Sequence, residues 1–129
     1  MVGVALDTNI AIDILNERTE IIPKLRSVSF AYLPITVCGE LLFGAKNSGR
    51  STTNEIKYVR FINTCIVLNV DFLVANQYAA IRKQLKSIGR PIPENDIWIA
   101  AICMVNNLAL ATHDKHFQYV DGLQLFDWF

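Results

Sequence analysis

Short apolar runs alternate with longer amphipathic patterns along this chain of 129 residues. Each run is short and almost continuously apolar, as in strands that helices cover on both faces. The runs span residues 2–6, 30–33, 65–68 and 108–111, with residues 123–126 as a candidate fifth. Parallel strands need a crossover segment between them, usually a helix. The alternation therefore predicts a three-layer α/β/α sandwich on a mainly parallel, roughly five-stranded sheet.

The segments between these runs carry helical patterns. One apolar stripe lies between a capping aspartate, Asp71, and a terminating glycine, Gly89, and consists of Val74, Tyr78, Ile81, Leu85 and Ile88. A second stripe extends from Ile97 to Leu108. We also expect helices over residues 10–16, 20–27, 36–47 and 53–64, with Gly44 as a weak point in the third.

Length and composition favour one domain over residues 1–129. The hydrophobic fraction of 52% supplies enough apolar surface to offset the entropy of ordering the chain. The longest apolar run, residues 97–105, is about half of the roughly 20 residues that a membrane span needs. Asp7 interrupts the first run before a signal-peptide core could form, so we expect a soluble, cytoplasmic protein without a membrane partner.

The three cysteines, Cys38, Cys65 and Cys103, lie among apolar neighbours and form no CxxC pair. We interpret them as reduced core residues. A zinc site is the alternative, but His113 and His116 have no cysteine close in sequence to complete a standard ligand set.

Four acidic residues occupy positions where a parallel sheet binds ligands, beyond the carboxyl ends of its strands. Asp7 follows the first predicted strand, and Asp114 follows the fourth. Asp96 lies in the first turn of a predicted helix, and Glu40 lies about one turn into another. Taken singly, the three aspartates could be helix caps or turn residues, and Glu40 could face solvent. Together, four converging carboxylates would repel one another unless cations lay between them, and oxygen ligands select hard ions such as Mg²⁺ or Mn²⁺.

A family resemblance supports the interpretation of the four acids as one metal site. The blocks ALDTNI around Asp7, GELLFGA around Glu40, RPIPENDIWIAA around Asp96 and LATHDKHF around Asp114 resemble the signature blocks of PIN domains. More narrowly, they are similar to VapC-type toxins of toxin–antitoxin pairs, and the similarity spans essentially the whole chain.

This resemblance implies an endoribonuclease in which Asp7, Glu40, Asp96 and Asp114 are the catalytic residues and hold Mg²⁺ or Mn²⁺. It implies water as the nucleophile, and hence products with 5′-phosphate and 3′-hydroxyl ends. Flanking polar residues would orient ligands or water; they are Thr8, Asn9, Asn95 and Thr112. His113 and His116 could contact phosphate or transfer protons, or could be ordinary core or surface residues.

Charge distribution bears on an RNA substrate. The net charge is zero, but residues 24–90 contain ten basic and three acidic residues, whereas the two ends contain nine acids and two basic residues. The basic middle segment could therefore follow an RNA backbone. The natural candidates for this contact, which could equally form a solvated helix face, are Arg82, Lys83, Lys86 and Arg90.

The resemblance also implies a homodimer and a cognate antitoxin that blocks the active site. Six apolar residues give the third and fourth helices more apolar surface than one small sandwich should cover, which favours self-association, although packing within the monomer is the alternative. They are Leu41, Leu42, Phe43, Ile56, Val59 and Ile62. A basic antitoxin side chain among the four acids would satisfy their charge.

Four other functions compete with this prediction. An aspartyl phosphatase would carry a second Asp where this chain has Asn9, and a receiver domain would carry a paired acid before Asp7. A related nuclease acting on single-stranded DNA stays open. A toxin-like module that binds without cutting is disfavoured because all four carboxylates are present.

Overall fold

The computed structural model describes residues 3–18, 20, 22–25 and 28–126. Within these residues, four parallel strands form one sheet in the order β3-β2-β1-β4. The strands are β1 (Gly3–Leu6), β2 (Phe30–Pro34), β3 (Ile66–Leu68) and β4 (Ala109–Ala111). The parallel sheet with flanking helices confirms the predicted fold class.

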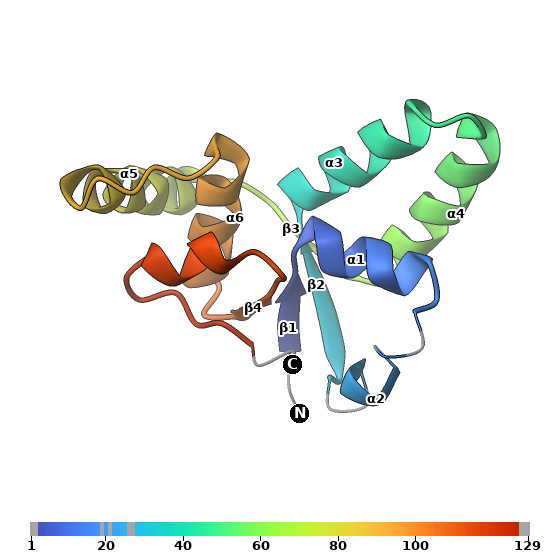
Figure 1. Ribbon diagram of the computed structural model, residues 1–129, viewed down its shortest axis with the longest axis horizontal. Helices are drawn as coiled ribbons and strands as arrows, with labels where there is room; N and C mark the ends of the chain where they lie inside the picture. The colour runs from blue at the N-terminus through green and yellow to red at the C-terminus, as the bar shows by residue number, and fades with distance from the viewer. Residues whose placement is uncertain (1–2, 19, 21, 26–27, 127–129) are drawn as a thin grey trace.

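Helices flank this sheet in two groups (Figure 1). To its right in that view lie α1 (Thr8–Leu15), α2 (Ile22–Leu25), α3 (Ile35–Lys46) and α4 (Ser51–Asn63). To its left lie α5 (Phe72–Ser87), α6 (Glu94–Val105) and the short 3₁₀ helix η2 (Lys115–Tyr119). The pairs α3 with α4 and α5 with α6 pack against each other as two arms above the sheet.

The predicted fifth strand, residues 123–126, is reduced to a single parallel bridge between Leu110 and Leu125. Leu110 N donates to Gln124 O (2.9 Å), and Phe126 N donates to Leu110 O (2.8 Å). β4 has only three residues, and its other edge pairs with β1. Backbone groups alternate between the two edges of a strand, so only the middle residue, Leu110, directs its N–H and C=O toward residues 123–126. The edge is therefore too short to hold a further strand.

One helix prediction also needs correction. The helix expected over residues 20–27 is the four-residue α2 in the described part of the chain, and residues 21 and 26–27 lie outside it. The helix α3 continues through Gly44 to Lys46, with Gly44 exposed and with Leu41 and Ala45 packed into the core. The expected signals around α5 are confirmed: Asp71 Oδ1 accepts from Val74 N (3.0 Å), and Gly89 has a φ of +66°.

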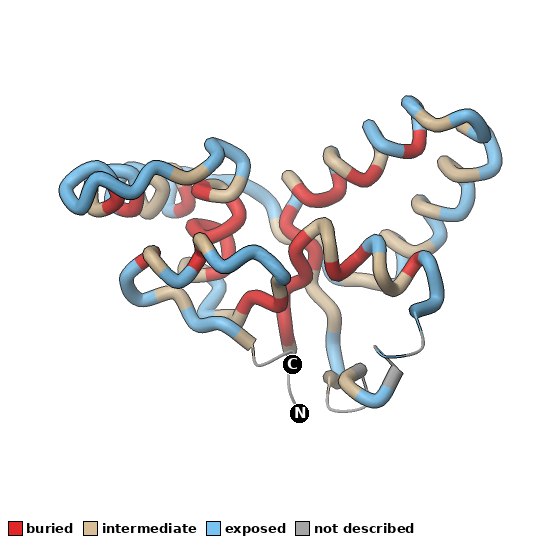
Figure 2. Tube along the Cα trace, in the orientation of Figure 1, coloured by how far each residue is buried: buried red, intermediate tan, exposed pale blue. Residues whose placement is uncertain are grey.

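The core is formed by the sheet together with the inner faces of α1, α3, α5 and α6. Val4, Ala5 and Leu6 of β1 are fully buried, and α6 is buried on most of its surface. Cys38 and Cys103 are buried and Cys65 is half-buried, and all three are free thiols, as expected. By contrast, α4 has no buried residue along its 13 residues (Figure 2). No helix in the described ranges is long and apolar enough to cross a bilayer.

Candidate active site

Two loops that leave neighbouring strands meet at the carboxyl edge of the sheet. Asp7 follows β1, and Thr112 and Asp114 follow β4. The strand order changes direction here, because β2 and β3 lie on one side of β1 and β4 lies on the other. Open α/β sheets bind ligands at such a switch point. A backbone hydrogen bond from Asp7 N to Ala111 O (2.9 Å) joins the two loops.

Asp7 is 3% exposed, and its carboxylate accepts three hydrogen bonds. Oδ1 accepts from the backbone N of Thr8 (2.8 Å), and Oδ2 accepts from the Thr112 hydroxyl (2.6 Å) and the Asn9 amide (3.3 Å). Burial raises the pKa of Asp7; the hydrogen bonds oppose this effect, and the charges of neighbouring acids add to it. Asp7 therefore caps α1 and also belongs to the acidic cluster, so the two interpretations of this residue are compatible.

Asn9 and Thr112 fix Asp114 relative to Asp7. Asn9 Nδ2, which bonds Asp7, also lies 3.4 Å from Asp114 Oδ2. Asn9 Oδ1 accepts from His113 N (3.1 Å), and the Thr112 hydroxyl oxygen accepts from Asp114 N (3.0 Å). Two carboxylates from distant parts of the chain are thus held by the same pair of polar side chains.

Glu40 is half-buried on α3, and each of its oxygens has a partner. Oε2 accepts from the Thr8 hydroxyl (2.9 Å), and Oε1 accepts from Asn95 Nδ2 (2.8 Å). Since Thr8 follows Asp7 and Asn95 precedes Asp96, these bonds connect Glu40 to both neighbouring loops. Glu40 is therefore neither an unpaired buried charge nor a free surface residue.

Asp96 lies in the first turn of α6, and its Oδ2 is 2.8 Å from His116 Nε2. Burial is the main cause that raises the pKa of Asp96 to about 6. The charge of Asp7 adds to the increase, the interactions with His116 oppose it, and Asp114 contributes a further small increase. The contributions of Asp7 and Asp114 show that the three carboxyl groups lie close enough to repel one another.

Three side chains of this cluster are spaced as metal ligands. One ligand atom each from Asp96, Asp114 and His116 lies within 4.8 Å of the other two. The two carboxylates suit a hard divalent ion such as Mg²⁺ or Mn²⁺, whereas an imidazole is a poor ligand for Mg²⁺. The donor set therefore fits a divalent metal without identifying the ion.

The structure brings together all four predicted acids and all four predicted polar neighbours. The role of His116 was not resolved from the sequence: it is neither a core nor a simple surface residue, because it bonds Asp96. His113 Nε2 instead lies 2.6 Å from Asp13 Oδ2, at the edge of the site. For His116, the signal available in the sequence was the spacing Asp114–x–His116 at the start of a short turn. The spacing alone does not say which group His116 contacts; its contact with Asp96 depends on how η2 lies against α6.

The predicted RNA-binding residues are exposed side chains of α5 and of the loop just after it; they are Arg82, Lys83, Lys86 and Arg90. Arg82 forms an ion pair with Glu94 of α6 (3.7 Å). The Arg90 guanidinium stacks over the ring of Tyr119, 4.6 Å from its centroid.

Compared with known proteins, the chain matches a family model described as PIN domain over residues 4–123. It is 32% identical to Ribonuclease VapC1 of Haemophilus influenzae, covering 95% of this chain and 96% of that protein. It is 28% identical to the tRNA(fMet)-specific endonuclease VapC of Shigella flexneri, covering 99% of both. Among solved structures, it superposes on a chain of DNA-bound VapBC from Salmonella typhimurium with a TM-score of 0.91 and 26% identity over 100% of both chains.

Proposed function

Because the chain belongs to the PIN domain family, we propose that it is a metal-dependent endoribonuclease and the toxin of a type II toxin–antitoxin pair. The observation that carries the proposal is the convergence of Asp7, Glu40, Asp96 and Asp114 at the switch point of a parallel sheet. Full-length similarity to proteins named as VapC ribonucleases supports RNA as the substrate.

We assign the metal site to these four acids, with Mg²⁺ as the ion and Mn²⁺ as a possible substitute. The bound ion supplies a polarised water for attack and positive charge opposite the phosphoryl oxygens. Asp7, Asp96 and Asp114 are the main ligands in this proposal, since Asn9, Thr112 and His116 already hold their carboxylates in place.

Glu40 is a ligand or the acceptor of the proton from the attacking water. Its two oxygens are positioned by Thr8 and Asn95, so it can face the substrate without rotating away. Attack by water, rather than by the ribose 2′-hydroxyl, leaves a 5′-phosphate and a 3′-hydroxyl end. Of the four predicted basic residues, Arg82 and Lys86 of α5 flank the first turns of α6, and these two are the proposed contacts for the RNA backbone.

The proposed partners are a cognate antitoxin and a second copy of the chain. Structures of VapBC complexes superpose closely on this chain, which supports an antitoxin. Of the apolar residues expected to drive self-association, Phe43, Ile56 and Val59 are 68%, 52% and 43% exposed. Leu41 was assigned wrongly, because it lies on the core face of α3 with 1% exposure, and Leu42 and Ile62 are half-buried.

A second apolar patch was not anticipated. Phe72 and Leu73 of α5 are 84% and 63% exposed, and Val70, just before the helix, is 44% exposed. They lie off the apolar stripe that packs α5 onto the core, and this offset was the signal available in the sequence. The two patches give this small chain more than one surface for a protein partner.

Cleavage of three substrates tests the proposed function. The purified chain is incubated with labelled single-stranded RNA, DNA of the same sequence and a small phosphate ester, with Mg²⁺, with Mn²⁺ and with EDTA. We expect cleavage of RNA only, dependent on the ion, and 5′-phosphate ends on the products. Cleavage of DNA at the same rate as RNA would favour a related nuclease that acts on single-stranded DNA. Binding without cleavage of any substrate would favour the interaction module.

A further inference from the structure

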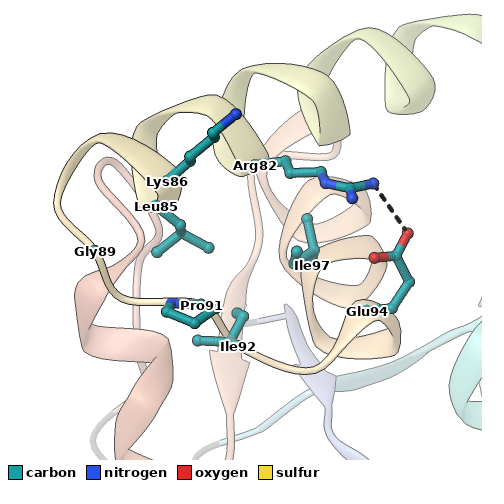
Figure 3. A pocket seen from close by; sticks show the side chains of 8 residues that line it. All are labelled: Arg82, Leu85, Lys86, Gly89, Pro91, Ile92, Glu94 and Ile97. Carbon is teal, nitrogen blue, oxygen red and sulfur yellow. Dashed lines mark ion pairs between the residues drawn. The ribbon is translucent and has the colours of Figure 1, made fainter.

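A pocket of about 510 Å³ lies between α5, the loop that follows it and the first turns of α6 (Figure 3). Its volume is within the range of roughly 300–1,000 Å³ that is typical of small-ligand sites. The pocket lies outside the acidic cluster, and the mechanism above does not use it.

The lining combines an apolar surface with a charged rim. Leu85, Pro91, Ile92 and Ile97 supply the apolar part. Flat rings such as nucleobases gain free energy by packing their faces against such a surface. An occupant with both an aromatic ring and negative charge fits this combination better than a purely apolar one.

The rim carries two cations and one acid, and the acid is already paired. Glu94 accepts hydrogen bonds from Tyr78 and forms an ion pair with Arg82. In the described part of the chain, Lys86 is exposed and has no ion pair, and in Figure 3 its side chain points away from Leu85 along α5. The pocket therefore has a net positive rim that suits a phosphate group.

The pocket and the acidic cluster share the first turn of α6. Glu94 and Ile97 line the pocket, while the residues between them, Asn95 and Asp96, contact Glu40 and His116. One helical turn rises only about 5.4 Å. A strand whose phosphate lies at the acids thus has an adjacent nucleotide within reach of the pocket.

We propose that this pocket is a subsite for one unstacked nucleotide of the RNA substrate, next to the bond that is cleaved. The base packs against Pro91, Ile92 and Ile97, and Lys86 binds the phosphate that follows. Single-stranded RNA is commonly recognised through bases turned out of the stack, so the site would contribute to the choice of cleavage position. The subsite rests on the proposed function for the identity of its substrate.

Two lysines on the same helix provide a matched test. Lys86 lines the pocket, whereas Lys83, equally exposed on α5, does not. Binding of a short labelled single-stranded RNA is measured by fluorescence anisotropy in an Asp114→Asn background, which prevents cleavage. We expect Lys86→Glu to weaken binding about tenfold and Lys83→Glu to weaken it by less than about threefold, because only the first removes a charged hydrogen bond. The salt dependence should also become shallower in Lys86→Glu alone.

A second measurement tests whether a base of the RNA enters the pocket. An RNA carrying one photoreactive uridine at successive positions is irradiated with the same protein, and the crosslinked peptides are mapped. We expect one position to crosslink within residues 89–97, and an abasic nucleotide at that position to weaken binding to the parent but not to Ile92→Glu.

The outcomes separate the two proposals. If the parent cleaves RNA while Lys86→Glu and Lys83→Glu bind it equally and crosslinks fall only on α3 or α4, the subsite is refuted and the nuclease stands. If the parent shows no ion-dependent cleavage, the proposed function fails, and the lysine pair and the crosslinks still decide whether RNA enters the pocket. Occupation of the pocket by a second copy of the chain, detected as a dimer lost in Lys86→Glu, would also overturn the subsite.

Discussion

His116 Nε2 lies 2.8 Å from Asp96 Oδ2, and this contact joins η2 to the first turn of α6. The imidazole also packs against Phe117, whose ring is fully buried, with the centroids 4.8 Å apart. The anchored imidazole limits the orientations that are open to the Asp96 carboxylate. Groups behind a metal ligand commonly tune its affinity in this way.

We therefore predict that His116→Ala weakens Mn²⁺ binding about tenfold, and that His116→Gln restores part of the loss because its amide can donate over a similar distance. Isothermal titration calorimetry of the metal-free protein measures the affinity. His113→Ala is the matched control, since His113 bonds Asp13 rather than one of the four acids. Equal affinity in the parent and His116→Ala would contradict the prediction.

Substitution of single acids should abolish cleavage while preserving the fold. Asp7→Asn, Asp96→Asn and Asp114→Asn should each lower the rate of RNA cleavage about a hundredfold or more. Asn leaves no cavity and removes one of the repelling charges, so the melting temperature without metal should not fall in Asp96→Asn and Asp114→Asn. In Asp7→Asn it should fall modestly, because the amide nitrogen cannot accept both bonds that Oδ2 accepts from Thr112 and Asn9. Asp121→Asn, an exposed acid outside the cluster, is the control. Full activity in all three cluster variants would refute the metal-site assignment.

Divalent ions should stabilise the parent protein against heat. The four acids repel in the metal-free state, and an ion that binds only the native state at a hundred times its Kd adds about 2.7 kcal/mol. For a chain of this size, that corresponds to a rise of roughly 10 °C in the melting temperature. The rise should be strongly reduced in Asp96→Asn. A parent protein that shows no shift in millimolar Mg²⁺ or Mn²⁺ has no such site.

The raised pKa of Asp96 affects how the stability of the fold and the binding of metal change with pH. Its folded-state pKa of about 6 lies above the unfolded value of 3.8, so the group favours the fold below about pH 4. That contribution is lost as the pH rises through about 6, and the metal-free protein should lose stability over this window. Metal binding needs the ionised carboxylate, so the stabilisation by Mn²⁺ should increase over the same window. Melting curves at about pH 5, 6 and 7, with and without Mn²⁺, measure both effects, and an ion effect independent of pH would exclude Asp96 as a ligand.

The two apolar patches should serve different partners. Ile56→Glu on α4 and Phe72→Glu on α5 each place a charge on one exposed patch, 52% and 84% exposed in the parent residues. We expect each variant to lose one assembly, either the homodimer or the antitoxin complex, and to keep the other. Light scattering and co-purification with the product of the neighbouring reading frame report the two assemblies. If one variant lost both assemblies, or if both variants kept both assemblies, the two patches would not serve different partners.

The sequence by itself determined most of the strands and helices and which acids lie just after a strand or near the start of a helix. Burial on both faces makes strands such as β1 continuously apolar, and the stripe from Val74 to Leu85 specifies α5 together with its cap at Asp71. These patterns are local, because each arises from the side of one strand or helix that faces the core. The position of Asp7 and Asp114 just after strands likewise follows from local order along the chain.

Tertiary structure alone decided which distant side chains meet. The bonds from Asn95 to Glu40 and from His116 to Asp96 join residues 55 and 20 positions apart, and no periodicity encodes them. The missing fifth strand depends on how few outward groups β4 offers to residues 123–126. The exposure of α4 follows from where the α3–α4 hairpin leaves the body, since an apolar residue is buried only if another element packs over it.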